Sequence, residues 1–123
     1  MTEPIIFVSR NKIREGKAEE FKNKYLASVP VTMDAKPGTI VQLAYQNEFN
    51  EVTIIRLFPS AEALDHQLQG AEDRSKVIYE LIEPTGIEIY GSPSIVTVEK
   101  MKKIAGSGIP VSISQSYLGG FIR

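Results

Sequence analysis

The spacing of apolar residues changes period along the chain, and the order of these changes constrains the fold more than any other feature. Alternating or β-branched runs, which indicate strands, occupy residues 5–13, 39–46, 52–58 and 87–90. Between them, apolar residues recur at the helical spacing, first after Lys17 and again after Ser60. The pattern therefore predicts the order strand, helix, strand, strand, helix, strand.

Proline, serine and glycine residues set the expected helix boundaries. Pro30 is expected to disturb the first helix, so that residues 31–36 form either a further helical turn or a loop. Ser60 is the expected N-cap of the second helix. Gly70 interrupts this helix, which is expected to resume over residues 71–83.

This order of elements is that of the split β-α-β arrangement, an α+β fold of the ferredoxin-like type. Its usual form is an antiparallel sheet of four strands with both helices on one face. Residues 1–92 are predicted to hold this domain. Residues 93–123 form a C-terminal extension, with a helix over 94–105 and an edge strand over 111–115, which packs on the same domain or on the partner subunit.

The predicted strands are apolar on both faces. In the first strand, Ile5 and Phe7 fall on one side, and Ile6 and Val8 fall on the other. Helices can cover only one face, and a solvated second face would show alternating polar residues instead. We therefore expect a homodimer, a dimeric α+β barrel in which a partner sheet covers the second face. The alternative is that the C-terminal tail folds back over it.

Charge and composition exclude several classes of function. Fourteen Lys and Arg residues against fifteen Asp and Glu residues leave a formal charge of -1, so no nucleic-acid or membrane partner is indicated. The chain has no cysteine and one histidine, which excludes thiolate catalysis and metal sites built from several Cys or His ligands. No signal peptide or membrane span is recognisable, and a cytoplasmic location is expected by default.

Four segments carry a resemblance to a known family. They are residues 16–21 (Gly-Lys-Ala-Glu-Glu-Phe), the hairpin with Tyr45 and Arg56, residues 60–65 (Ser-Ala-Glu-Ala-Leu-Asp) and residues 87–91 (Ile-Glu-Ile-Tyr-Gly). Through them about two thirds of the chain resembles the antibiotic biosynthesis monooxygenases. The resemblance implies oxidation of a small aromatic or quinol-like substrate by molecular oxygen, with no metal, flavin or other cofactor. Other proteins of this type bind or degrade haem.

The resemblance also implies a site. Oxygenases of this type often use Asn, Trp, Tyr, Arg and His side chains in a pocket between helices and sheet. This chain has no tryptophan. Many relatives place a His immediately before the leucine of the second helix, where this chain has Gln67, and His66 lies one residue earlier. One step along a helix turns a side chain by about 100°.

Three polar residues are the candidates for catalysis. Arg56 lies on the same side of its strand as Val52 and Ile54, and a charge among apolar neighbours requires either a ligand or a structural ion pair. Asn11, toward the end of the first strand, has an amide that could hold a phenolate or an oxyanion. Histidine ordinarily titrates near neutrality, so His66 is either a proton-transfer group or a solvated histidine.

Tyr45 and Tyr79 are the predicted substrate contacts, although Tyr79 is also typical of a core aromatic with a solvated hydroxyl. Two functions stay open. The first is a cofactor-independent oxygenase for a small, electron-rich aromatic or quinol. The second is a non-catalytic dimeric binding or accessory module. An apolar pocket on which at least two of Asn11, Arg56 and His66 converge would favour the oxygenase.

Overall fold

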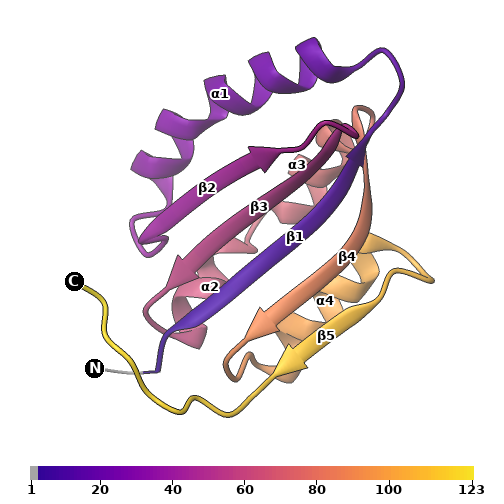
Figure 1. The fold of residues 1–123 in the computed structure, drawn as a ribbon. Helices are drawn as coiled ribbons and strands as arrows, with labels where there is room; N and C mark the ends of the chain where they lie inside the picture. The colour runs from indigo at the N-terminus through magenta and orange to yellow at the C-terminus, as the bar shows by residue number, and fades with distance from the viewer. Residues whose placement is uncertain (1–2) are drawn as a thin grey trace.

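A five-stranded sheet organises residues 3–123, which are the residues that the computed structural model describes (Figure 1). In space the strands follow the order β2-β3-β1-β4-β5. β1 pairs antiparallel with β3 and β4, whereas β5 runs parallel to β4. The strand bounds are β1 Ile5–Ile13, β2 Val41–Gln46, β3 Glu51–Phe58, β4 Ile82–Tyr90 and β5 Val111–Ser114.

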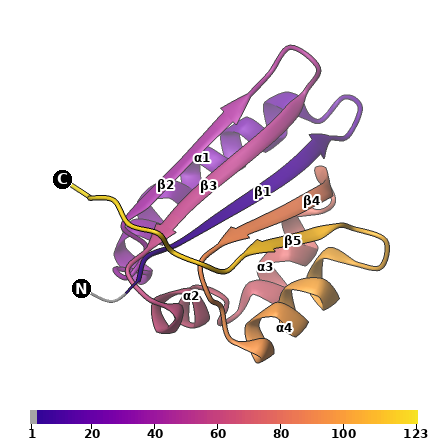
Figure 2. The same ribbon diagram turned by 60° about the horizontal axis from the view of Figure 1, so that its bottom comes forward.

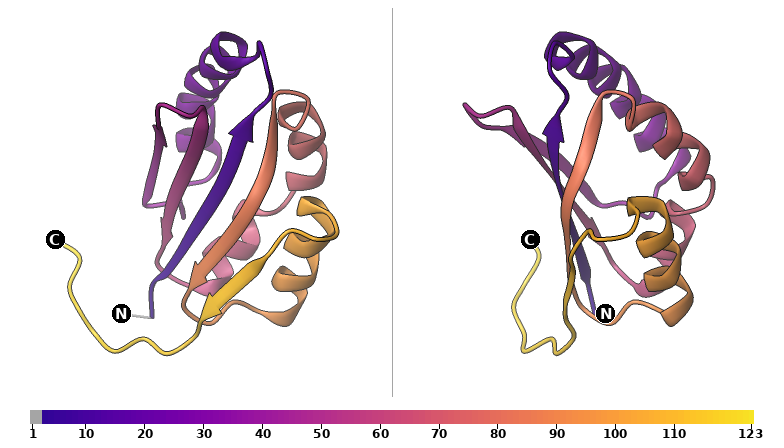
Figure 3. Two further views of the ribbon diagram at one scale, coloured as in Figure 1. Left: turned by 45° about the vertical axis from the view of Figure 1, so that its right-hand side comes forward. Right: turned by 90° about the vertical axis from the view of Figure 1, so that its right-hand side faces the viewer.

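The predicted α+β fold of the ferredoxin-like type is confirmed, and the sheet of one chain is open rather than closed into a barrel. All the helices described lie on the same face of the sheet, which leaves its other face uncovered by helices (Figure 3). The helix bounds are α1 Ala18–Ala35, α2 Ala61–Gln67, α3 Ala71–Ile78 and α4 Ile95–Ala105. Within residues 3–123, none of them is both long and apolar enough to cross a membrane.

Local residues explain where the second helical segment begins and breaks. The backbone N–H of Ala63 donates to Ser60 Oγ at 3.2 Å, so Ser60 is the N-cap of α2 as predicted. Gly70 has a φ of 74°, a left-handed conformation that glycine adopts at little cost, and it separates α2 from α3.

Of the two alternatives for residues 31–36, the further helical turn is confirmed, because α1 continues through Pro30 to Ala35. A proline in a helix removes the hydrogen bond to the carbonyl four residues earlier, here that of Leu26. Leu26 is exposed, so water can solvate that carbonyl, and the cost of the missing bond is reduced.

The expected helix over 71–83 was also too long, since α3 ends at Ile78 and β4 starts at Ile82. The strand therefore contains Pro84 and begins before the expected residue 87. The pairing of β1 with β4 shifts register between Arg10 and Asn11, opposite Pro84 and Gly86. A proline is tolerated at such a bulge because its missing N–H interrupts no regular ladder.

Alternate residues of each strand divide between the two faces. Odd positions of β1 and even positions of β3 face the helices, where Ile5, Phe58 and Ile89 form a core with Leu64 of α2. Even positions of β1 and odd positions of β3 form the open face. The apolar side chains of the open face, from all strands except β5, are Ile6, Val8, Val41, Leu43, Tyr45, Ile55, Leu57 and Tyr90.

The C-terminal extension has two parts that behave differently. Met101 of α4 is buried in the same core as Ile5 and Phe58, and β5 hydrogen-bonds to β4. Beyond β5, residues 115–123 have no helix or strand and pass the end of the sheet near the start of β1 (Figure 2). They lie on the side of the open face (Figure 3). Leu118 and Phe121 of this tail are 98% and 81% exposed in the single chain.

Candidate functional site

A cavity of about 560 Å³ lies between the helix-covered face of the sheet and the helices. This volume is within the range of roughly 300–1,000 Å³ that small-molecule sites occupy. Its walls are largely apolar, with Phe7 and Ile54 from the sheet, Phe21 from α1, and Leu64 and Met101 from the helices opposite. Such walls displace water from a bound ligand and strengthen any electrostatic contact inside.

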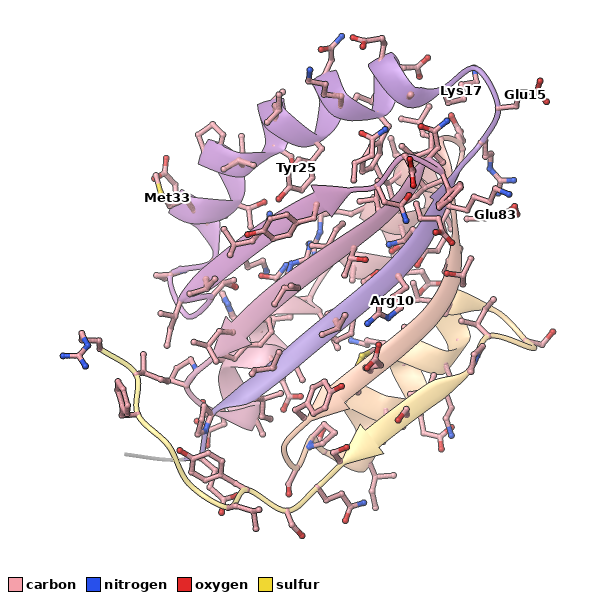
Figure 4. All side chains as sticks on the ribbon, in the orientation of Figure 1. Arg10, Glu15, Lys17, Tyr25, Met33 and Glu83 are labelled. Atoms are coloured by element: carbon pink, nitrogen blue, oxygen red, sulfur yellow. The ribbon has the colours of Figure 1, made fainter. Side chains whose placement is uncertain are left out.

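Exposed side chains mark the rim of the cavity, which opens between α1 and α3. Lys24 and Ser28 of α1, and Arg74 and Val77 of α3, line the cavity and are exposed. Lys24, Ser28 and Thr32 recur at helical spacing with Phe21 and Tyr25, so one stripe of α1 forms this wall. Tyr25 points from α1 toward the sheet, whereas Met33 lies near the far end of the helix (Figure 4).

Arg56 of β3 is the cation inside the cavity. Its Nε donates to Oε1 of Gln42, its direct neighbour on β2, at 2.8 Å. Burial lowers the pKa of Arg56 to about 10; Tyr25 raises it again in part, while the cation Arg74 lowers it further. Arg56 is half-buried and lines the cavity. At neutral pH Arg56 is therefore a charged group in an apolar enclosure.

Gln42 links Arg56 to the helices. Its Nε2 lies 3.5 Å from the hydroxyl of Tyr25, a weak contact at the limit for a hydrogen bond. On the opposite wall, burial raises the pKa of Tyr79, while its hydrogen bond to Ser75 and the charge of Arg56 act in the other direction. Tyr79 remains a neutral phenol near neutral pH, and Gln42 is a neutral amide. Neither Tyr79 nor Gln42 therefore neutralises the charge of Arg56.

Asn11 of β1 lines the cavity two residues beyond Ser9 and is 2% exposed. Its Nδ2 donates to Ser9 Oγ at 2.9 Å and lies 3.3 Å from the carbonyl oxygen of Ser9. Its Oδ1 is buried and has no hydrogen-bond partner in the described chain. A buried amide oxygen without a donor costs free energy, which a ligand that donates to it would recover.

The cavity has no acidic wall. Among the described residues, no Asp, Glu or His side chain lines it. Its charged lining residues are Lys24, Arg56 and Arg74, all cationic. The cavity therefore favours anions, and it offers no group that ordinarily accepts a proton near neutral pH.

Three of the five predicted site residues line this cavity: Arg56, Asn11 and Tyr79. His66 does not line it, because it is exposed on α2, where its backbone carbonyl accepts a hydrogen bond from Lys36 at 2.8 Å. Tyr45 lies on the open face and is 62% exposed. Tyr45 and Arg56 therefore lie on opposite faces of one hairpin.

Sequence reasoning missed the glutamines of the site. Gln67, one step beyond His66, is buried, lines the cavity and accepts a hydrogen bond from Thr39 at 2.7 Å. Gln42 alternates with the apolar Val41 and Leu43, a pattern that on sequence grounds indicates only a solvated strand face. The strand register could have identified Gln42. A hairpin that pairs Gln46 with Val52 also places Gln42 directly opposite Arg56.

Comparison of the whole fold with solved structures finds close likenesses. MupZ from Pseudomonas fluorescens has a TM-score of 0.73 at 16% identity and covers 100% of this chain and 91% of its own. SnoaB from Streptomyces nogalater, named as a cofactor-independent oxygenase, has a TM-score of 0.61 at 14% identity, covering 77% of this chain and 98% of its own. No family model matches the sequence, and no curated protein matches it.

A third structure carries the family name. A protein from Caulobacter crescentus, provisionally named as an antibiotic biosynthesis monooxygenase, has a TM-score of 0.63 at 20% identity, with 72% of this chain and 88% of its own covered. At these identities the likeness shows the fold. The resemblance that the sequence indicated is thereby confirmed at the level of the fold.

Proposed function

We propose that this chain is a cofactor-independent monooxygenase that acts on a small aromatic or quinol-like substrate bound in the cavity. The observation that supports it most directly is Arg56, a cation held within apolar walls, whose one hydrogen bond within residues 3–123 is to the neutral Gln42. Such a cation suits the oxyanion of an ionised phenol or quinol. The likeness of the fold to a protein named as a cofactor-independent oxygenase adds support.

The proposed reaction uses electrons that the substrate itself supplies. A substrate carbanion transfers electrons to dioxygen, a CH₂ carbon becomes a carbonyl, and the second oxygen atom leaves as water with both hydrogens. No external reductant is needed. The chain contributes an electrostatic partner for the oxyanion, Arg56, and an apolar enclosure that keeps water from the reactive intermediate. Asn11 orients the substrate, and His66 is at most a proton relay outside the cavity.

A second function has an observation of its own. Because no carboxylate or histidine lines the cavity in residues 3–123, the wall offers no general base for proton removal near neutral pH. A non-catalytic module that binds an anionic aromatic compound would need the same Arg56 and no base. Turnover separates the two functions.

The test is oxygen consumption by the purified protein, treated with a chelator, against a panel of quinols and hydroxylated aromatics. The oxygenase proposal predicts uptake that scales with protein concentration and is insensitive to the chelator. Tight binding of panel compounds without protein-dependent uptake would instead support the binding module.

We propose further that the chain functions as a homodimer through the open face of the sheet. Ile6, Leu43 and Tyr45 are all exposed there in the single chain, beside Ile55 and Leu57. A contiguous apolar surface of this kind is typical of a protein interface. The dimeric barrel that the sequence suggested would arise when two such open sheets face each other.

The tail is part of this proposal. Leu118 and Phe121 gain almost no burial from their own chain, although the tail lies on the side of the open face. We propose that residues 115–123 cross to the open face of the partner subunit, where these side chains would be covered.

A further inference from the structure

We propose that the cavity selects a flat aromatic acid that enters as an anion and carries a hydrogen-bond donor at its far end, away from the charge. The inference rests on the proposed function, because it concerns the same cavity, and it specifies the class of substrate. Two side chains of the cavity floor carry it: Arg56 of β3 and Asn11 of β1.

Arg56 is the interior cation that has unused N–H donors. A guanidinium has five N–H donors, and in the described structure the only hydrogen bond of Arg56 is the one from Nε to Gln42. Arg74 differs, because it donates to the carbonyl oxygens of Gln69 at 2.7 Å and Gln67 at 2.6 Å. These carbonyls lie at the C-terminal end of α2, where a cation is structural. Arg56 is therefore the group that an anionic oxygen would meet.

Asn11 presents an acceptor, and its orientation follows from Ser9. A backbone carbonyl can only accept, so the amide group that approaches the Ser9 carbonyl must be the NH₂. Oδ1 therefore faces away from that contact, buried and unpartnered. The complementary ligand group is a donor, such as a hydroxyl.

The sheet register sets the spacing between the two groups. Arg56 pairs with Phe7, and Asn11 lies four residues along β1 from Phe7 on the same face. Four strand residues span roughly 13 Å between Cα atoms. The hydrogen bond to Gln42 holds the Arg56 side chain on the β2 side of β3, away from β1, so a ligand that meets both groups must be elongated. Ser9 and Ile54 pair with each other between the levels of Arg56 and Asn11, and Phe7 lies beside Arg56, so the floor between the two groups is partly apolar.

The absence of a base decides the charge state of the ligand. Since no Asp, Glu or His of residues 3–123 lines the cavity, a neutral acid has no partner there to take its proton. A ligand that is already an anion in solution neutralises the positive charge of Arg56 when it binds. The cavity therefore favours a ligand with a negative charge near Arg56 and a hydrogen-bond donor near Asn11.

The experiment uses 6-hydroxy-2-naphthoate, which has a carboxylate and a hydroxyl at opposite ends of a flat ring system. Its affinity, measured by titration calorimetry without oxygen, is compared with those of the uncharged 6-hydroxy-2-naphthamide and of 6-methoxy-2-naphthoate, which cannot donate. We expect the hydroxy acid to bind about 10–100-fold more tightly than the amide, the range for a hydrogen bond to a charged group. It should also bind more tightly than the methoxy acid.

Variants assign each preference to its residue. Arg56→Gln should abolish the preference for acid over amide, and Asn11→Leu should abolish the preference for hydroxy over methoxy while the acid preference stays. Lys12→Gln is the control, because Lys12 is exposed on the opposite face of β1 and carries the same charge as Arg56. It should leave both preferences unchanged.

Binding and turnover test the inference and the oxygenase proposal separately. Equal affinity for acid and amide, an acid preference that survives Arg56→Gln, or no binding of the hydroxy acid at millimolar concentration would each overturn the inference. Oxygen consumption with an uncharged quinol and no acid preference would overturn it while the oxygenase proposal stands. An acid preference without oxygen uptake by any panel compound would uphold the inference and reject the oxygenase.

Discussion

Arg56 and Gln42 are direct partners across the β2–β3 hairpin, and a 2.8 Å hydrogen bond from Nε to Oε1 joins them inside the cavity. A neutral amide orients the guanidinium but does not neutralise it. The protein thus holds a desolvated charge that is ready for a ligand, and such a charge reduces the stability of the empty fold.

Replacing that charge by an apolar side chain of similar length should stabilise the empty protein. We predict that Arg56→Met raises the free energy of unfolding by about 1–3 kcal/mol, because an uncompensated buried cation is removed. Thermal and urea denaturation would measure this. Gln42→Met is the counterpart, since it leaves Arg56 without its acceptor, and it should destabilise the fold by a similar amount. A less stable Arg56→Met protein would contradict the interpretation of Arg56 as an uncompensated charge.

The pKa of Arg56 predicts how anion binding depends on pH. Because burial lowers this pKa to about 10, the affinity for 2-naphthalenesulfonate, an anion at any accessible pH, should be constant from pH 7 to 9. Above pH 10 it should fall tenfold per unit as the guanidinium loses its proton. The groups around Arg56 are the phenols of Tyr25 and Tyr79 and the cation Arg74. Fluorescence titration of wild type against Arg56→Gln checks this, since the variant should show no such step there.

The same shift has a consequence for stability. A base whose pKa is lower in the folded than in the unfolded state destabilises the fold while it is charged. The penalty is full below pH 10 and is relieved as the pH rises from about 10 toward the higher pKa that the guanidinium has in the unfolded chain. The advantage of Arg56→Met over wild type should therefore shrink over this interval.

The order of elements and the strand positions could be predicted from period alone, because alternation and helical spacing are local properties. The start of β4 could not, since Leu81 and Ile82 suit the buried side of a helix or a strand equally well. Their state is decided by pairing with β1, where Ile82 lies opposite Ile13. The sequence left open whether the helix continues past Pro30, because the cost of a proline depends on whether its surroundings are solvated.

Only part of the candidate site could be predicted, because some of its residues stand out in the sequence and others do not. Arg56 and Asn11 were found because a polar residue in an apolar strand is anomalous on sequence grounds. Gln42 was missed because a glutamine that alternates with apolar residues is typical of a solvated strand face. Gln67 occupies the position where many relatives have a histidine, but its amide was not a candidate because attention went to His66. His66 attracted attention by its chemistry, but one position on α2 separates it from the cavity that Gln67 lines.

The open face predicts a dimer that a single charge should break. We expect wild type to elute as twice 13.6 kDa by size exclusion with light scattering. Leu43→Asp should be monomeric yet folded, because Leu43 is already 47% exposed in the single chain. Leu26→Asp on α1, where the leucine is 55% exposed, is the matched control and should remain dimeric. Monomeric wild type at micromolar concentration would refute the dimer.

Two truncations separate the parts of the C-terminal extension. Removal of residues 92–123 deletes Met101, which is 2% exposed in the core, and should lower the melting temperature severely or prevent folding. Removal of residues 115–123 deletes mostly exposed side chains, so the fold should survive. The dimer dissociation constant should rise, because the proposed contacts of the tail with the partner subunit are lost. An unchanged dimer dissociation constant after the shorter truncation would show that the tail does not cross to the partner.

The most direct test of the central claim is the rate of oxygen consumption by Arg56→Ala compared with His66→Ala, on the best quinol of the panel. Removal of a positioned donor to a developing oxyanion typically costs on the order of 100-fold in turnover. We therefore predict that Arg56→Ala loses about that factor while it stays folded and dimeric, and that His66→Ala, whose imidazole lies outside the cavity, loses far less. Equal rates for wild type and Arg56→Ala, or a greater loss in His66→Ala, would contradict the account.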